Sequence, residues 1–238
     1  MKIGFFYLFL QNFINDFAIP KNQVMARKET IDAVKKALEE SKKLGRKFRQ
    51  TIDVAINLKD VNLNDPKNRI DEEIILPHGR GKEAKVAVFA GGELALKAKK
   101  VADLVIKPED IPDLAKDKKK MKKIANTYDF FVAEAPLMPT IGRSLGVILG
   151  PRGKMPKPVP PTADIEAIVN SLRKTVKLRS KGRKTFHTIA GTEDMDPEQI
   201  AENIEAIIRR LEEKLERGRE NIESIYVKTT MGPSERIM

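Results

Sequence analysis

Two kinds of hydrophobic pattern divide this chain. Toward both ends, apolar residues recur at helical spacing or alternate singly with polar residues, which predicts amphipathic helices and half-buried strands. Between residues 80 and 174, apolar runs such as VAVFA, LVI and FFVAEA are nearly continuous and alternate with helical stretches. That second pattern is typical of parallel strands covered on both faces of a sheet.

The two ends of the chain predict a shared set of elements. The expected elements are a helix at 27–44, strands at 52–58 and 70–76, a hairpin of strands 176–179 and 184–189, and a long helix at about 197–217. The segment SIYVKTTMGPSE, residues 224–235, then predicts a last strand that stops at Thr229.

Because the ends look alike and the centre differs, the sequence predicts an α+β two-domain protein. Residues 25–79 and 175–238 are expected to form a discontinuous α+β first domain. Residues 80–174 are expected to form an α/β second domain with a parallel sheet, inserted into the first.

The first 24 residues differ from the rest, being rich in phenylalanine and almost uncharged. The apolar run 3–10 is short, only Lys2 precedes it, and no A-x-A cleavage pattern follows, which disfavours a signal peptide. Polar residues interrupt the stretch before it reaches the length of a membrane span. We expect residues 1–24 to be a disordered extension or a start assigned too early, with Met25 as the native start and no membrane partner.

Charge changes this picture because it is unevenly distributed. The chain carries 45 Lys and Arg against 34 Asp and Glu, and the net charge of +11 favours a polyanionic partner such as nucleic acid. Formal charges are +2 for residues 25–79, +8 for 80–174 and 0 for 175–238. Electrostatics alone would therefore place a nucleic acid on the second domain.

Candidate catalytic and metal chemistry is sparse. The chain has no cysteine and two histidines, which excludes a disulfide framework, disfavours a metal site and suits an intracellular, cytoplasmic protein. His78 in LPHGRGKEAK has no nucleophile or acidic partner legible in the sequence, so a turn histidine is favoured over a catalytic one. We expect no enzymatic activity and no cofactor or metal.

The stretch VAVFAGGELALKAKK has the strand, glycine turn and helix of a phosphate-binding loop. It lacks both G-x-G-x-x-G and G-x-x-x-x-G-K-[ST]. An ordinary tight turn is therefore favoured, and a nucleotide site is kept as an alternative.

Two basic segments lie in the predicted second domain. Six lysines within 116–123 form either a solvated helix face or a source of sequence-blind attraction for phosphates. In GVILGPRGKMPKPVPP, glycines and prolines stiffen a loop that carries Arg152, Lys154 and Lys157. A rigid connector and a preordered basic finger are equally compatible with this loop.

The predicted first domain offers a different kind of binding chemistry. Phe48 precedes a strand, where its ring either stacks on a sugar or packs in the core. In TTMGP, small hydroxyl groups and a glycine without Cβ allow another backbone to approach closely. Such a surface suits contacts to phosphate and to the 2′-hydroxyl groups of RNA.

Three long motifs in order resemble the archaeal type of the large-subunit ribosomal protein L1 family. They are LPHGRGKEAK at 76–85, LGVILGPRGKMPKPVP at 145–160 and YVKTTMGP at 226–233, and weaker similarity covers nearly everything from Met25 onward. The first 24 residues have no recognised counterpart. The resemblance implies a first domain made of both chain ends and an inserted, Rossmann-like second domain.

The resemblance also implies a function and partners. The protein would be a constituent of the large ribosomal subunit that binds large-subunit ribosomal RNA to form the mobile stalk. It would assist the movement and release of exit-site tRNA, and it would repress translation by binding its own operon mRNA. It would be a monomer when free of the ribosome.

Site residues follow from the same resemblance, position by position. The main RNA contacts fall on Phe48, Ser224, Thr230, Met231 and Gly232. Plausible additions are Lys47, Thr51, Asp53, Lys181 and Arg183. Hinges between the domains are expected near Gly79, Gly81, Lys174 and Val176.

Two rival functions stay open at this point. One is a ribosome-assembly factor of the same fold that leaves before the subunit is mature. The other is a nucleotide-dependent enzyme that uses the glycine turn in AGGELA. The resemblance also places the specific contact on a nearly neutral domain, whereas charge points to the other domain.

Overall fold

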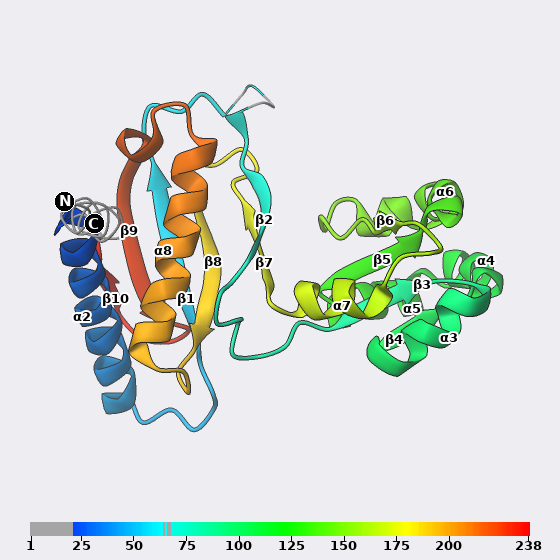
Figure 1. The fold of residues 1–238 in the computed structure, drawn as a ribbon, viewed down its shortest axis with the longest axis horizontal. Coiled ribbons are helices and arrows are strands. Elements are labelled where there is room, and N and C mark those ends of the chain that lie inside the picture. The colour runs from blue at the N-terminus through cyan, green and yellow to red at the C-terminus, as the bar shows by residue number, and fades with distance from the viewer. Residues whose placement is uncertain (1–20, 64, 66–67) are drawn as a thin grey trace, which may run out of the picture.

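The computed structural model describes residues 21–63, 65 and 68–238. Residues 1–20 of the predicted extension therefore lie outside the described residues. The elements form two groups joined by two stretches of chain (Figure 1). One group contains both ends of the described chain, and the other contains its middle.

A four-stranded antiparallel sheet forms the centre of the first group, in the order β10-β9-β1-β8. Its strands are β1 (Thr51–Leu58), β8 (Thr185–Thr192), β9 (Ile222–Thr229) and β10 (Ser234–Arg236). The predicted strands at 52–58 and at the end of the chain are confirmed. The sequence did not predict β10, in which the chain turns back after Thr229 and pairs with β9.

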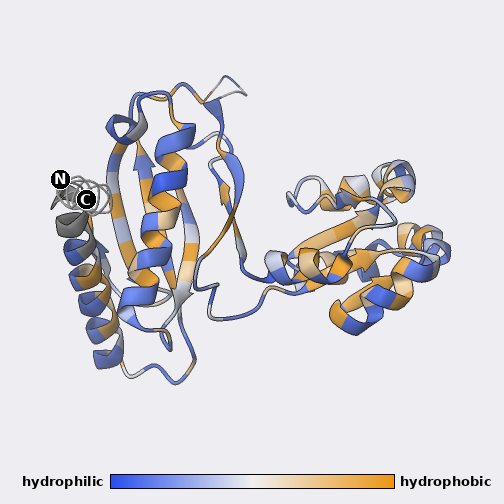
Figure 2. Cartoon of the chain, viewed as in Figure 1, coloured by the Kyte–Doolittle hydropathy of each residue, from blue (hydrophilic) through white to orange (hydrophobic). Residues whose placement is uncertain are grey.

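Two helices, α2 (Lys21–Lys43) and α8 (Pro197–Lys214), cover one face of this sheet (Figure 1). Alternate residues of β1, such as Ile52 and Val54, are buried in one core with apolar residues of both helices. Both helices carry hydrophobic and hydrophilic stripes in Figure 2, as expected for helices with one buried side. Helix α2 begins earlier than predicted, and α8 has proline at its first position, a favoured helix start.

The predicted hairpin of 176–179 and 184–189 is wrong in its pairing. Strand β7 (Thr175–Arg179) pairs with β2 (Asp71–Ile75) in a separate two-stranded sheet, and β8 pairs with β1. Ser180 explains the separation, because its N–H donates to the Ile70 carbonyl at 3.0 Å and its Oγ accepts the Ile70 N–H at 3.0 Å. The turn therefore ties β7 to the β2 side before β8 begins.

The second group is built on a parallel sheet in the order β4-β3-β5-β6. Its strands are β3 (Val86–Phe89), β4 (Leu104–Ile106), β5 (Phe130–Glu134) and β6 (Lys157–Val159). Its helices are α3 (Gly92–Val101), α4 (Ile111–Lys116), α5 (Lys118–Thr127), α6 (Met138–Leu149) and α7 (Ile165–Arg173). Short 3₁₀ helices lie at Pro108–Asp110 and Ala135–Leu137, and a third, Gly218–Asn221, belongs to the first group.

Both faces of the parallel sheet are covered. Val86 and Val88 of β3 pack in one core with α3 and α7, whereas Ala87 and Phe89 pack in another with α4, α5 and α6. All four residues of β3 are therefore buried. The nearly continuous apolar runs of the sequence have this origin.

The fold class is confirmed: a discontinuous α+β first domain is interrupted by an inserted α/β second domain. The two connections between the domains lie against each other, since the Leu76 N–H donates to the Lys174 carbonyl at 3.1 Å and the Ala84 N–H to the Arg173 carbonyl at 3.4 Å. The boundaries near residues 79 and 175 stay a prediction, which this adjacency supports. None of the helices in the described part of the chain combines the length and apolar character of a membrane span.

Candidate nucleic-acid interface

One face of the four-stranded sheet has no described helix over it (Figure 1). We call it the open face. Strand β1 presents to it every residue that does not enter the core, because the side chains of a strand alternate between the two faces. The open face carries Thr51, Asp53, Ala55 and Asn57 of β1, Thr185 and His187 of β8, and Ser224, Tyr226 and Lys228 of β9.

Ser224 lies in a row of hydrogen-bonded side chains across this face. Its hydroxyl accepts a hydrogen bond from Asn57 Nδ2 at 2.8 Å, and the Asn57 Oδ1 accepts one from the Thr185 hydroxyl at 2.8 Å. Asn57 therefore fixes the Ser224 oxygen as an acceptor, which leaves the Ser224 proton to be donated elsewhere. Only 6% of the Ser224 surface is exposed, so the structure supports Ser224 as a member of this hydrogen-bonded row rather than as an open contact for a partner.

Thr51 and Thr230 meet at the opposite end of β1. Their hydroxyl oxygens are 2.9 Å apart, and the Thr51 N–H donates to the Thr230 hydroxyl at 3.2 Å. The Thr230 N–H in turn donates to the Thr51 carbonyl at 3.0 Å. These bonds hold an exposed pair of hydroxyl groups in one arrangement at the edge of the open face.

Met231 extends from the turn between β9 and β10, with 52% of its surface exposed. The turn is held from behind by Gln50, whose buried Oε1 accepts the Met231 N–H at 3.0 Å while its Nε2 donates to the Ser41 hydroxyl at 2.7 Å. Helix α2 and the turn are thus joined through one buried amide.

Gly232 serves the turn itself. A Cβ at this position would lie 2.3 Å from the Thr229 Oγ1, so a larger residue requires the buried Thr229 side chain or the turn to shift. The sequence suggested that this glycine admits another molecule's backbone. In the structure, the group that approaches Gly232 closely is the side chain of Thr229 in the same chain. The turn therefore favours glycine at this position even without a bound partner.

Phe48 and Lys47 lie exposed in the segment before β1, and half of the Phe48 surface is accessible. Of the two readings of Phe48, the structure favours the surface ring over the buried one. The segment is fixed by its neighbour Arg49, whose Nη2 donates to the Gly81 carbonyl and to the Thr192 hydroxyl, both at 3.0 Å. A planar ring on a fixed backbone is suited to stack on a base or sugar.

Asp53 lies half-buried on the open face between the two groups of hydroxyls. Burial raises the pKa of the Asp53 carboxyl above its ordinary value, and the nearby His187 and Lys228 act in the opposite direction. A carboxylate repels phosphate but accepts hydrogen bonds from sugar hydroxyls and base amino groups. Asp53 is therefore suited to the non-phosphate groups of a nucleic acid.

The predicted contact residues are not all brought together. Phe48, Thr51, Thr230 and Met231 gather at one end of β1, whereas Ser224 pairs with Asn57 near the other end. The exposed Lys181 and Arg183 lie beyond that second end, in the turn that leads into β8. At about 3.3 Å per residue the two ends of β1 are roughly 20 Å apart. The candidate interface is thus the whole open face rather than one spot.

The basic loop of the second domain does not project as a free finger. Lys154 Nζ donates to the carbonyls of Ala125 at 2.9 Å and Tyr128 at 2.7 Å, and burial lowers the pKa of Lys154. Arg152 donates to the Ile148 carbonyl at 2.9 Å.

Lys157, in the unpredicted strand β6, pairs with Glu73 of β2. The rigid-connector reading describes this loop better.

The lysine run forms a solvated helix face. Asp117 caps α5 by accepting the N–H groups of Lys119 and Lys120 at 3.1 and 3.0 Å. The five lysines of α5 are all exposed, while Met121 and Ala125 of the same helix enter the core.

The expected hinge residues lie where the two connections meet. Gly79 and Gly81 have φ values of +71° and +74°, a conformation that favours glycine. Each carbonyl is held by the first domain, Gly79 by Asn203 Nδ2 at 2.9 Å and Gly81 by Arg49. Lys174 and Val176 lie on the returning connection, Val176 buried at the start of β7. Their role as hinges stays a prediction.

The glycine turn after β3 has a carboxylate where a phosphate would bind. Glu134 Oε2, from the end of β5, accepts the Gly91 N–H at 3.2 Å at the start of α3. A negative charge in that place opposes a second anion. The geometry therefore favours the ordinary tight turn over a nucleotide site.

His78 has an acidic neighbour that the sequence did not reveal. The ring Nε2 of His78 contacts the Glu202 carboxylate of α8. The backbone N–H of His78 donates to Asn203 Oδ1 at 3.1 Å. These contacts attach the turn to α8. No group of three or more potential metal ligands gathers within the part of the chain that the structure describes.

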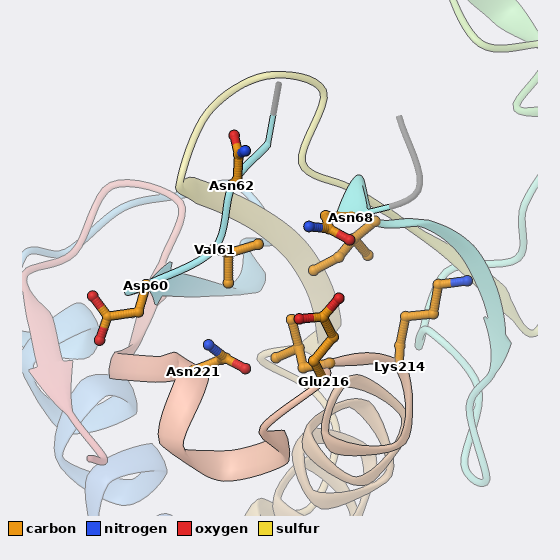
Figure 3. A pocket seen from close by; sticks show the side chains of 9 residues that line it. Asp60, Val61, Asn62, Asn68, Lys214, Glu216 and Asn221 are labelled. Carbon is orange, nitrogen blue, oxygen red and sulfur yellow. The ribbon is translucent and has the colours of Figure 1, made fainter. Parts of the chain in front are cut away.

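A separate cavity of about 140 Å³ lies at the C-terminal end of α8 (Figure 3). Asp60, Glu216 and Asn221 line it, and Asn221 already bonds to the Arg217 N–H and the Lys59 carbonyl. None of the predicted contact residues borders this cavity.

The family model for the ribosomal protein L1p/L10e family matches residues 34–233 of this chain. The chain belongs to this family. Among its relatives, the large ribosomal subunit protein uL1 of Methanocella arvoryzae is 58% identical over 215 residues, which cover 90% of this chain and 100% of the relative. The proteins of the same name from Methanothermobacter thermautotrophicus and Haloferax volcanii are 54% and 53% identical, covering 89% and 87% of this chain and 100% and 97% of theirs.

Membership of the family confirms the resemblance found in the sequence motifs, including its archaeal type. The assignment of RNA contacts to individual residues stays a prediction. Sequence reasoning missed Gln50, Asn57, Thr185, Tyr226 and His187, which the structure places behind or on the open face. Strand alternation could have indicated Asn57 and Tyr226, since they occupy the polar positions of their strands. No local signal indicates that Gln50 is buried behind a turn 181 residues later.

Proposed function

We propose that this protein is a constituent of the large ribosomal subunit that binds large-subunit ribosomal RNA directly and forms the mobile stalk. Family membership and the shared name of its relatives support the ribosomal role. The open face supports the binding role, because it is a broad, polar surface of a stable sheet with no described element over it.

The observation that carries the proposal is the arrangement of Thr51, Thr230 and Met231 at one end of β1, the end that follows the exposed Phe48 in the chain. Two fixed hydroxyl groups and one exposed thioether lie at this end of β1, and one exposed ring lies in the segment that leads into the strand. Hydroxyls bond to ribose and phosphate oxygens, while the apolar groups pack on sugars and bases. Such contacts recognise the shape of folded RNA without needing high local charge.

The proposal includes two further activities expected of the family. The protein assists movement and release of exit-site tRNA through the position of its second domain. It also represses translation by binding a similar RNA fold in its own operon mRNA. In each case it acts by binding, as a monomer and without catalysis.

Replacing Met231 with alanine tests the binding surface. We expect the affinity for purified large-subunit ribosomal RNA to fall by about 1–3 kcal/mol, the usual scale for a central contact. Leu96→Ala is the matched control, because Leu96 is also an exposed apolar residue but lies on α3 of the second domain. Equal RNA affinity of the two variants in a filter-binding titration would reject the assignment of Met231.

Sedimentation tests the ribosomal role. A constituent of the subunit is expected to co-sediment with mature large subunits at high salt. An assembly factor of the same fold would instead be found only with immature particles. Recovery of the protein in the immature fractions alone would replace the proposed function with that alternative.

A further inference from the structure

A cleft of about 330 Å³ lies between the domains and borders the open face. Thr51 and Ile189 line it from the first domain, and Thr127 and Asp129 from the second. Arg80, Lys82 and Lys85 line it from the connection between β2 and β3. Thr51 is thus shared by the cleft and by the predicted RNA contact surface. A chain lying on the open face can enter the cleft without a break.

The cations of this cleft are poorly partnered. Within the described residues, the ammonium groups of Lys82 and Lys85 are exposed and make no ion pair or hydrogen bond. The Arg80 side chain is only 15% exposed, its Nε is buried without a hydrogen-bond partner, and its Nη1 lies 3.6 Å from the nearest Asp129 oxygen. A buried donor without an acceptor is unfavourable, so an anion here would satisfy Arg80.

The acidic residues of the cleft do not balance these cations. Glu83 is the other carboxylate in the lining, and it lies 3.4 Å from Arg173, which draws it toward the second domain. Asp129 lies 3.6 Å from Arg80 and also attracts Lys154 of the neighbouring cavity. Three cations therefore meet two carboxylates, of which one is already paired outside the cleft.

A neighbouring cavity of about 250 Å³ shares Arg80 and Asp129 but differs in this respect. Its Lys154 bonds to two carbonyls, and its Lys177 bonds to Glu73 at 3.1 Å and to the Gly153 carbonyl at 2.9 Å. Those cations stabilise the protein itself. The free positive charge lies in the outer cleft.

We infer that this cleft is a second RNA-binding site, in which Arg80, Lys82 and Lys85 hold a phosphodiester segment of the RNA bound on the open face. The inference rests on the proposed function. Arginine supplies a planar set of donors for phosphate oxygens, lysines supply point charges, and the Thr51 and Thr127 hydroxyls supply further donors. The first domain recognises the RNA shape, and the cleft attaches its backbone to the second domain.

A double variant, Lys82→Gln with Lys85→Gln, tests the inference in the full chain. The matched control is Lys99→Gln with Lys100→Gln, two exposed lysines at the end of α3 that lie outside the cleft. In filter-binding titrations with purified large-subunit ribosomal RNA at about 0.1 M salt, we expect the cleft variant to bind about 5- to 10-fold more weakly. Each lost phosphate contact also lowers the slope of log affinity against log salt by about 0.7–0.9.

The control variant is expected to bind within about 2-fold of the unchanged protein. A second measurement uses acetylation of lysines read by mass spectrometry, in which RNA is expected to protect Lys82 and Lys85 while Lys99 and Lys100 stay reactive. Equal affinity of the two variants and equal reactivity of the four lysines would overturn the inference and would point to an acidic protein segment as the occupant.

Failure of the proposed function gives a different result. If the unchanged protein does not bind the RNA at all, the proposed function and the cleft site both fall. If the unchanged protein binds, Met231→Ala weakens binding and the cleft variant matches its control, only the cleft site falls.

Discussion

The two four-stranded sheets of this molecule are covered in different ways. The parallel sheet of the second domain buries both faces against its own helices, so nothing of it is left for a partner. The four-stranded sheet of the first domain buries one face and presents the other, which carries the polar Thr51, Asp53 and Asn57 of β1 beside the small Ala55. The domain with less net charge is therefore the one that leaves a sheet face uncovered among the described residues.

This difference teaches that charge and binding surface are separate properties. Counting charges predicted the second domain as the site of RNA contact, because it carries +8 of the total +11. Much of that charge lies on the solvated face of α5 or bonds within the protein, as Lys154 does. Long-range attraction and specific contact can thus reside in different domains of one chain.

The largest expected effect on stability concerns Gly81, which lies in the connection from β2 to β3 and is attached to the first domain. In Gly81→Ala, the new Cβ would lie 2.1 Å from the Thr192 Oγ1, and φ of +74° strains any residue with a Cβ. We expect the free energy of unfolding of the first domain to fall by about 3 kcal/mol. Calorimetry should show a lowered transition for that domain.

The control for this prediction is Gly142→Ala in α6 of the second domain, where a Cβ would meet nothing within 4 Å. Removing a glycine from a helix interior is expected to stabilise by about 0.5–1 kcal/mol. A Gly81→Ala protein as stable as the unchanged one would show that the connection is not fixed to the first domain.

The next effect concerns the buried amide behind the open face. Gln50→Met keeps the side-chain length but removes the bonds to Ser41 and Met231, which should lower stability by about 1–2 kcal/mol and lower RNA affinity by a similar amount. Chemical denaturation and filter binding measure the two quantities. Gln199→Met, on α8, serves as the control, and a loss of RNA affinity equal in both variants would exclude a role for Gln50 in positioning the turn.

An effect of similar size concerns the contact between the domains. Glu73 of β2 pairs with Lys157 of the second domain and with Lys177 of β7. Burial alone would raise the pKa of Glu73, but hydrogen bonds from the two lysines outweigh it, so the pKa lies below the ordinary 4.5. A carboxyl with a lowered pKa stabilises the contact above pH 4.5, and that stabilisation is lost as the pH falls through the lowered value.

At neutral pH the contact is therefore at full strength, and Glu73→Gln should weaken it by about 1–2 kcal/mol. Small-angle X-ray scattering is expected to show a larger radius of gyration for this variant. Glu93→Gln is the control, since Glu93 pairs only with Lys97 within α3. An unchanged radius in Glu73→Gln would mean that other contacts hold the domains together.

Much of the fold could be predicted from the sequence because each domain has a clear hydrophobic period. The positions of β1, β3, β4 and β5 follow directly from apolar alternation or runs. The pairing of β7 could not, because a turn sequence does not say which sheet each strand joins. Strand β6 was hidden by prolines, which are accommodated here in an edge strand.

The candidate interface was predictable only in part. Motif resemblance indicated Phe48, Thr230 and Met231, and all three are exposed, Thr230 against the first residue of β1 and Phe48 in the segment before that strand. The supporting bonds, from Asn57 to Ser224 and from Gln50 to Met231, join segments more than 160 residues apart. Such contacts depend on the completed fold, so no short stretch of sequence carries them.

The central claim is that the nearly neutral first domain holds the specific RNA contact. Its core contains no residue from 80–174, and Gly79 lies next to Lys174, so Gly79 can be joined to Thr175 without residues 80–174. A calorimetric titration of this first domain with purified large-subunit ribosomal RNA is the most direct measurement. We predict binding within about 10-fold of the full chain, weakened further by Met231→Ala. A first domain that is folded by circular dichroism but does not bind the RNA would contradict the claim.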